Sequence, residues 1–292
     1  MSLVVAQATA DGPRIVADTR VTRTDRQARE PGFKGTLKSV VVRPDAVVCF
    51  AGDVVAGLGA VREVARGLQV GETVDGLLPH LQVVASDPRR EVEFIVATDQ
   101  PDSQLTRVRY DSIERNLDSA WTGDHEAFER FQQARHAPVD SGWVELESKL
   151  PASAREGIRL GEAMQTVIDD PTIPSVGDFR VSIVHRSSGF QYLESSFIHV
   201  GRDITIQPGD DMISKMAQPV EEGGYAVSVV EAAEPGTPAL GLSFPRARLA
   251  MLFLPLEYDD VQVIREVAPN GYAKAIYERC GVVMKDPPLR HS

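Results

Sequence analysis

Apolar runs of strand length open the chain and occur in pairs. Residues 2–10 and 14–18 are rich in Val, Ile and Ala and flank an Asp-Gly dipeptide, which is typical of a hairpin turn. Residues 38–43 and 46–51 form a second pair around a Pro-Asp turn. The second pair is apolar at successive positions, so we expect its strands to be buried on both faces.

A helical period of apolar residues replaces the strand pattern after Gly52. Asp53 stands where the N-cap of a first helix is expected. Pro79 lies inside the second predicted helix, at residues 73–85, and weakens that prediction. Helices are predicted at residues 53–71, 73–85, 125–135, 153–169 and 272–279, and further strands at 91–98, 105–110, 180–185, 190–194, 225–230, 239–244, 249–254 and 261–267. Residues 21–31 and 136–151 are expected to be loops or linkers, and residues 285–292 a loose tail. This mixture of strand pairs and helices predicts an α+β protein.

Composition limits the classes of protein to consider. The chain has 292 residues, enough for one large domain or for a domain of about 200 residues with an extension. Its net charge of −11 argues against nucleic acid and anionic membranes as partners. Two cysteines suit a reducing compartment, no later apolar run could span a bilayer, and no basic residue precedes the first apolar run. We therefore expect a cytoplasmic protein.

The second residue offers the chemistry of a nucleophile. If Met1 is removed, Ser2 carries a free α-amine beside its own hydroxyl, at the start of a strand. An unperturbed α-amine has a pKa of about 7.7 to 8.0, so it can accept a proton near neutral pH. A hydroxyl and a base on one residue form the simplest nucleophile and base pair that a chain can make.

Three blocks carry a resemblance to a known family: Ser2 at the start of the first strand, Asp18 in the setting Ile-Val-Ala-Asp-Thr-Arg, and the segment from Phe33 to Gly52. Their order and spacing resemble the proteasome β-subunit superfamily of N-terminal nucleophile hydrolases, among its bacterial relatives HslV and Anbu. The resemblance implies that Ser2 is the nucleophile and that Asp18 and Lys38 form a charged pair, with Lys34 as the competing lysine. It also implies that Gly52 is the oxyanion-hole glycine and that the Thr122 hydroxyl assists the amine. Asp170 would be the acidic residue before the last hairpin of the domain.

The same resemblance implies a fold. It is a four-layer αββα sandwich of two antiparallel sheets, spanning residues 1–195. Residues 196–292 lie beyond it and are expected to form a C-terminal, β-rich extension with a short helix. The chain departs from the family pattern in two places: Ser2 stands where a threonine is usual, and Asp124 replaces a glycine and is best placed to cap the next helix.

The activity that the resemblance implies is hydrolysis of peptide bonds through an acyl-enzyme on Ser2. Two alternatives stay open: an amidohydrolase acting on a small amide, and a scaffold that assembles without catalysis. The family's habit implies a homo-oligomeric ring or spiral, with an ATPase or an adaptor as a further partner. We expect neither a cofactor nor a metal, because the six histidines lack ligand spacing.

Overall fold

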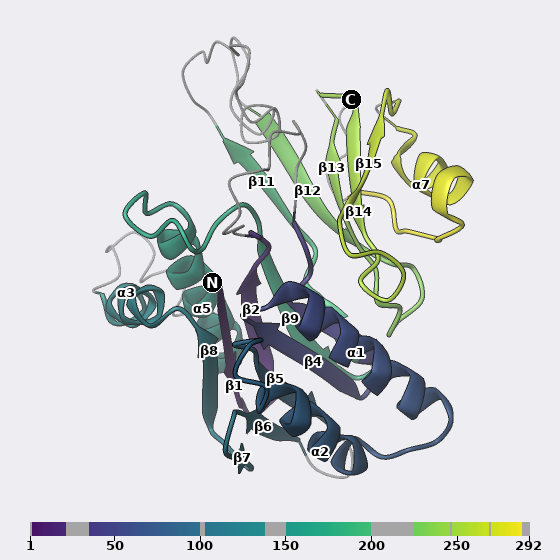
Figure 1. Cartoon of the computed structure of the whole chain (residues 1–292). Helices are drawn as coiled ribbons and strands as arrows, with labels where there is room; N and C mark the ends of the chain where they lie inside the picture. The colour runs from purple at the N-terminus through teal and green to yellow at the C-terminus, as the bar shows by residue number, and fades with distance from the viewer. Residues whose placement is uncertain are drawn as a thin grey trace.

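A computed structural model describes residues 2–21, 35–99, 103–137, 150–199, 225–245, 247–268 and 270–287. These ranges contain five helices and three antiparallel sheets of five strands each (Figure 1). The α+β class predicted from the sequence is therefore confirmed. Within the described ranges no helix is long and apolar enough to cross a bilayer.

The first sheet surrounds the N-terminal strand, in the order β10-β9-β2-β1-β8. Side chains of β1 alternate between two environments: Val4 and Ala6 join the core that the sheet shares with the second sheet, whereas Leu3 and Val5 pack on the helices of the opposite side. Its strands are β1 (Leu3–Gln7), β2 (Arg14–Asp18), β8 (Ser119–Gly123), β9 (Arg180–Arg186) and β10 (Gly189–Tyr192).

The second sheet has the order β3-β4-β5-β6-β7 and is covered by two helices. All six residues of β4 are buried, which confirms the burial expected from its unbroken apolar run. The strands are β3 (Ser39–Arg43), β4 (Ala46–Ala51), β5 (Glu93–Thr98), β6 (Gln104–Val108) and β7 (Ile113–Glu114). The helices are α1 (Val54–Gln69) and α2 (Val74–Ala85).

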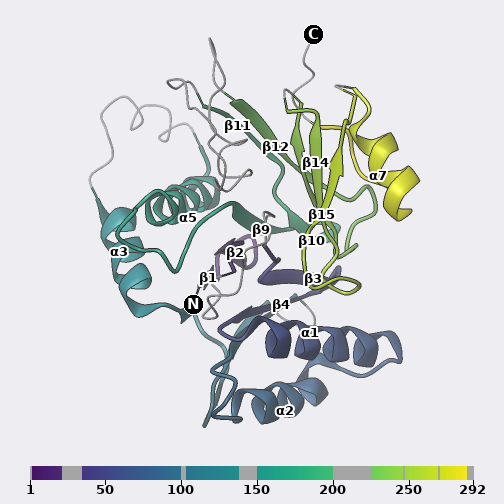
Figure 2. The ribbon, with the colours of Figure 1, turned by 45° about the horizontal axis from the view of Figure 1, so that its top comes forward.

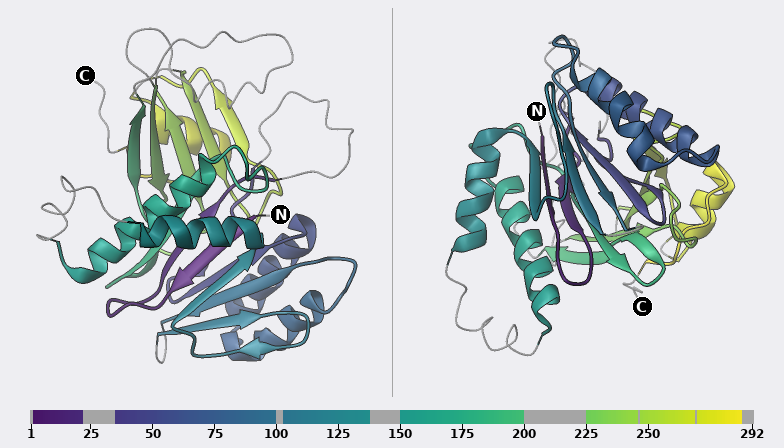
Figure 3. Two further views of the ribbon diagram at one scale, coloured as in Figure 1. Left: turned by 90° about the vertical axis from the view of Figure 1, so that its left-hand side faces the viewer. Right: turned by 90° about the horizontal axis from the view of Figure 1, so that it is seen from below.

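These two sheets pack face to face, with helices on their outer sides. Strands β1 and β8 of the first sheet contact β4 of the second. Helices α1 and α2 contact the second sheet, and α5 (Ala152–Ile168) contacts the first and packs against α3 (His125–His136). Figure 2 and the right-hand view of Figure 3 show the two helix pairs on opposite sides of the sheets.

The third sheet follows from residue 195 and has the order β11-β12-β13-β14-β15. One of its faces contributes Val227, Leu242 and Met251 to the core shared by the first two sheets, and its other face is covered by α7 (Tyr272–Cys280). Its strands are β11 (Ser195–His199), β12 (Tyr225–Glu231), β13 (Leu240–Phe244), β14 (Leu249–Phe253) and β15 (Gln262–Arg265).

Three strands and the start of the tail differ from the sequence-based expectations, and two predicted loops lie almost entirely outside the description. Residues 119–123 form edge strand β8, and β7 and β11 were not predicted. The predicted loose tail begins with an ordered contact, in which the Lys285 N–H donates to the Glu231 carbonyl at 3.1 Å. The predicted loops at 21–31 and 136–151 fall almost entirely outside the described residues.

Candidate active site

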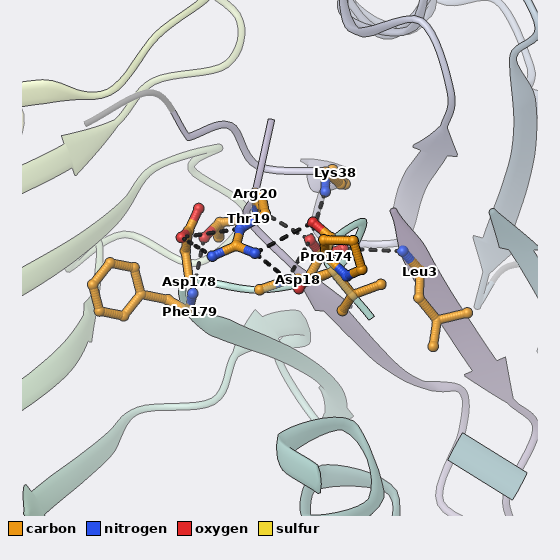
Figure 4. Close-up of polar contacts among 10 residues, drawn as sticks. Leu3, Asp18, Thr19, Arg20, Lys38, Pro174, Asp178 and Phe179 are labelled. Carbon is orange, nitrogen blue, oxygen red and sulfur yellow. Dashed lines mark hydrogen bonds and ion pairs between the residues drawn. The ribbon is translucent and has the colours of Figure 1, made fainter. Parts of the chain in front are cut away.

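Asp18 is the centre of a buried polar cluster at the end of β2. Its side chain is fully buried and accepts hydrogen bonds from three backbone N–H groups. Leu3 donates to Oδ1 at 3.0 Å, and Arg20 and Gly177 donate to Oδ2 at 3.1 and 3.3 Å (Figure 4). The donors come from β1, from the end of β2 and from the segment before β9, so the carboxylate joins three parts of the chain.

Lys38 supplies a fourth hydrogen bond to this carboxylate. Its Nζ donates to Asp18 Oδ2 at 2.8 Å, and the lysine is 2% exposed. Burial lowers the pKa of Lys38 below its ordinary value, and the attraction of Asp18 opposes the shift. The Lys38 carbonyl accepts the Phe50 N–H at 2.8 Å, which connects the pair to the end of β4. The structure thus places Lys38 against Asp18, whereas the competing Lys34 lies outside the described residues.

Ser2 lies beside this cluster, one residue before Leu3. It is 2% exposed, and its carbonyl accepts the Asp124 N–H at 2.7 Å. Side chains two positions apart on a strand share a face, so Ser2 projects with Val4 toward the second sheet, from which Lys38 comes. Ser2 therefore lies on the face where the two sheets meet.

Gly123, the last residue of β8, and Gly52, after the end of β4, both have positive φ and no room for a Cβ. Gly123 has φ +115°, and a Cβ there would lie 1.8 Å from the Ser2 carbonyl oxygen. Gly52, between β4 and α1, has φ +108°, and a Cβ would lie 1.8 Å from the Glu91 carbonyl oxygen. Asp53 caps α1 by accepting the Ala56 N–H at 2.9 Å. Backbone geometry alone therefore demands glycine at position 52, whatever part it plays as an oxyanion donor.

Thr122 faces the same side of the first sheet as Ser2. It is fully buried, lies opposite Val4 across β1 and β8, and donates from Oγ1 to Glu93 Oε2 at 2.9 Å. Glu93 pairs with Ala51 across β4 and β5, one residue before Gly52. Hydrogen bonds, one strand pairing and peptide bonds together connect the candidate residues other than Asp170. The hydrogen bonds join Asp124 to Ser2, Leu3 to Asp18, Lys38 to Asp18, Phe50 to Lys38, and Thr122 to Glu93, and the strand pairing joins Glu93 to Ala51, the neighbour of Gly52.

Asp170 lies apart from this cluster. Its Oδ2 accepts a hydrogen bond from Arg130 Nε at 2.9 Å, and its Oδ1 accepts the Thr172 N–H at 3.0 Å. The hydrogen bonds from Thr172 lower the pKa of Asp170. These contacts tie the end of α5 to α3, and no hydrogen bond or ion pair found for Asp170 in the described residues leads to Asp18.

Asp178 is linked to the cluster around Asp18 through Arg20. Its Oδ1 lies 3.3 Å from Arg20 Nη2, and Arg20 Nη1 also reaches the carbonyls of Pro174 and Val176, at 3.3 and 3.4 Å (Figure 4). Burial raises the pKa of Asp178, and the Arg20 charge opposes the shift. Asp178 has φ +65°, an uncommon conformation for a residue with a side chain.

A signal for Asp178 was present in the sequence. It stands two residues before β9, nearer to the last hairpin than Asp170, and follows a Val-Gly pair that could turn the chain. Arg20, two residues after Asp18, was also missed as a site residue. Arg20 and Asp178 pair with each other across about 158 positions of the chain. Sequence periodicity gives no information about contacts at such a separation.

In the described residues no group of three or more His, Cys, Asp and Glu side chains could hold a metal ion. No protein-family model matches this chain, and the search of curated proteins finds no significant match. The interpretation of the site therefore rests on its own geometry.

Proposed function

We propose that this chain is an N-terminal nucleophile hydrolase of the proteasome β-subunit type, which cleaves peptide bonds with Ser2 after Met1 is removed. The observation that carries the proposal is the buried Lys38–Asp18 pair, 2.8 Å apart, directly beside the first strand. A lysine and an aspartate that are both withdrawn from water are costly for a fold to keep. A catalytic role beside a serine that can carry a free α-amine would account for keeping this costly pair.

The order of layers supports the proposal. Helices α1 and α2, the second sheet, the first sheet and the pair α3 and α5 succeed one another, as expected of an αββα sandwich (Figure 3). In this interpretation residues 1–195 are the catalytic domain, and the C-terminal sheet adds to the core that the first two sheets share.

The first half of the reaction forms an ester on the enzyme. Ser2 Oγ attacks the substrate carbonyl carbon while the Ser2 α-amine takes the hydroxyl proton. The Lys38 ammonium, held by Asp18, favours the developing alkoxide by its positive charge. The Gly52 N–H would donate to the oxyanion, a contribution of roughly 3 kcal/mol to the barrier. The C–N bond then breaks, and the α-ammonium returns its proton to the leaving amine.

The second half releases the product. A water molecule attacks the ester carbonyl, and the α-amine takes the proton of that water. The bond to Oγ breaks, Oγ regains the proton, and the free carboxylic acid leaves. Because Ser2 is 2% exposed, both halves require this end of β1 to open. Loss of Met1 would free the amine.

Intact mass followed by hydrolysis assays tests the proposal. We expect purified protein from its native host to lack Met1 and to cleave members of a fluorogenic peptide panel. Ser2→Ala should lower the rate at least about a thousandfold, whereas Ser2→Thr should keep activity. Ser188→Ala is the matched control, because Ser188 lies in the exposed turn between β9 and β10.

The other outcomes separate the alternatives. Cleavage of small amides without cleavage of any peptide would favour the amidohydrolase. Activity that survives Ser2→Ala would reject Ser2 as the nucleophile and with it both enzymatic alternatives. Retention of Met1 would favour a scaffold. Sedimentation adds an independent measurement: the proposal includes a homo-oligomeric ring or spiral in which peptide substrates are enclosed, served by an ATPase or adaptor, and a monomer would contradict that assembly.

A further inference from the structure

A carboxylate of the second sheet reaches a buried hydroxyl of the first sheet beside Ser2. Glu93 Oε2 accepts the Thr122 hydroxyl at 2.9 Å, with Thr122 fully buried and the Glu93 side chain 38% exposed. The two residues come from β5 and β8, which belong to different sheets. The bond therefore fixes the Thr122 side chain from outside its own sheet.

The chemistry of the two groups determines the direction of this hydrogen bond. An ionised carboxylate has no proton to donate, so the Thr122 hydroxyl must donate its only proton to Glu93. Arg109 Nε lies 3.4 Å from the same Glu93 oxygen and supplies the counter-charge, although it is not oriented for a hydrogen bond. The Arg109 guanidinium is steadied by Trp121, whose ring centroid is 6.0 Å from its carbon.

Once Thr122 has donated to Glu93, only its oxygen lone pairs remain for other partners. The hydrogen bond of 2.7 Å from Asp124 N–H to the Ser2 carbonyl extends the ladder of β1 and β8 by one residue. Thr122 and Ser2 are then diagonal neighbours on one face of the first sheet. The hydroxyl oxygen that remains available near Ser2 is an acceptor.

We infer that Glu93 is a positioning residue for the Ser2 amine, an inference that rests on the proposed function. Glu93 holds the Thr122 proton away from Ser2, so that the Thr122 oxygen accepts an N–H of the α-amine. The lone pair of the amine is then free to face the Ser2 hydroxyl. In Glu93→Gln the neutral amide can donate as well as accept, and the hydroxyl no longer has one fixed direction.

Titration of the Ser2 α-amine tests this inference without any need for hydrolysis. The full chain beginning at Ser2 is obtained by natural loss of Met1 or by cleavage of an N-terminal ubiquitin fusion, with ¹³C-labelled serine. The Ser2 Cα and Cβ shifts are followed against pH by NMR. We expect Glu93→Gln to lower the pKa of the amine by about half a unit or more, because an acceptor and a nearby negative charge both favour the ammonium form.

Two variants separate positioning from simple loss of charge. In a Thr122→Val background, Glu93→Gln should produce less than a third of its effect in the wild type, because the hydroxyl that transmits it is gone. Glu114→Gln is the matched control: Glu114 also pairs with an arginine of the second sheet, Arg107, and we expect it to leave the Ser2 titration unchanged.

The outcomes distinguish this inference from the proposed function. In an active enzyme, Glu93→Gln should lower kcat about tenfold with little change in KM. If the chain hydrolyses peptides but Glu93→Gln leaves the amine titration and kcat as in the wild type, the inference is wrong and the function stands. An equal shift with and without Thr122 would also overturn it, in favour of a direct charge effect. A shift that needs Thr122 in a chain that hydrolyses nothing would support the inference and remove the proposed activity.

Discussion

Replacing Lys38 by methionine would test the ion pair at the centre of the site. Methionine keeps most of the length of the lysine stem and removes the ammonium, so the surrounding packing changes little. The substitution leaves Asp18, 0% exposed, as a buried carboxylate without its counter-charge. Removing one partner of a buried pair typically costs about 3 to 5 kcal/mol of stability.

The structure indicates where in this range the cost should fall. Three backbone N–H groups still donate to Asp18 in the variant, at 3.0, 3.1 and 3.3 Å. They offset part of the loss, so we expect Lys38→Met to lower the free energy of unfolding by about 3 kcal/mol. The double variant Asp18→Asn/Lys38→Met removes both charges and keeps one side-chain oxygen, which can accept from Arg20 and Gly177 but not also from Leu3, whose partner is the other oxygen. It should recover more than half of that loss.

Urea denaturation at pH 7, followed by circular dichroism, measures these differences. Lys274→Met is the matched control, because Lys274 is 79% exposed and lies 3.7 Å from Glu278 on α7. An exposed pair of this kind should contribute less than about 0.5 kcal/mol. A free energy of unfolding for Lys38→Met within about 1 kcal/mol of the wild-type value would contradict this expectation, and so would a double variant less stable than Lys38→Met.

Three further substitutions test other details of the structure by the same denaturation measurement. Gly123→Ala should cost more than about 2 kcal/mol, because φ is +115° and the new Cβ would meet the Ser2 carbonyl at 1.8 Å; a neutral result would contradict this turn. Gly59→Ala, in α1, should instead stabilise by about 0.5 to 1 kcal/mol, because the new Cβ would meet nothing within 4 Å beyond its chain neighbours and the backbone of its own helix. A loss of stability would mean that the position is not open. Tyr192→Phe removes the buried acceptor of the Val41 N–H at 3.2 Å and should cost about 1 to 3 kcal/mol; an unchanged midpoint would show that this bond is replaced.

The helices and strands could be predicted from the sequence because their signals are local, whereas the pairing of Lys38 with Asp18 was expected only from the resemblance to the proteasome β-subunits. Asp18 ends a strand, and Lys38 precedes the first strand of the next pair. Their apolar neighbours alternate or run on in patterns that define strands. β8 was harder, because residues 119–123 contain Ser and Gly and lie at a sheet edge, where the period of two is weak.

Glu93 and Asp178 could not be assigned a partner before the sheets were assembled. Glu93 is one residue of a predicted strand, and its partner Thr122 belongs to another sheet. Asp178 reaches Arg20 across about 158 positions. Asp170 was the candidate for the acidic residue that the resemblance places before the last hairpin, and in the structure its partners are Arg130 and Thr172. Pairings of this kind depend on topology, which local patterns do not encode.

The glycines at positions 52 and 123 and the buried charged pair of the site differ in what they indicate about function. Gly52 and Gly123 have positive φ and close against backbone carbonyls, so the fold needs them whether or not the chain is an enzyme. The positive φ of Asp178, +65°, is shared by Glu91, Asn116, Arg248 and Glu266, so it does not single out the site. The buried Lys38–Asp18 pair contributes little that apolar packing could not supply. Residues that a stable fold does not require, gathered beside one serine, are therefore the part of this structure that favours catalysis over a purely structural role.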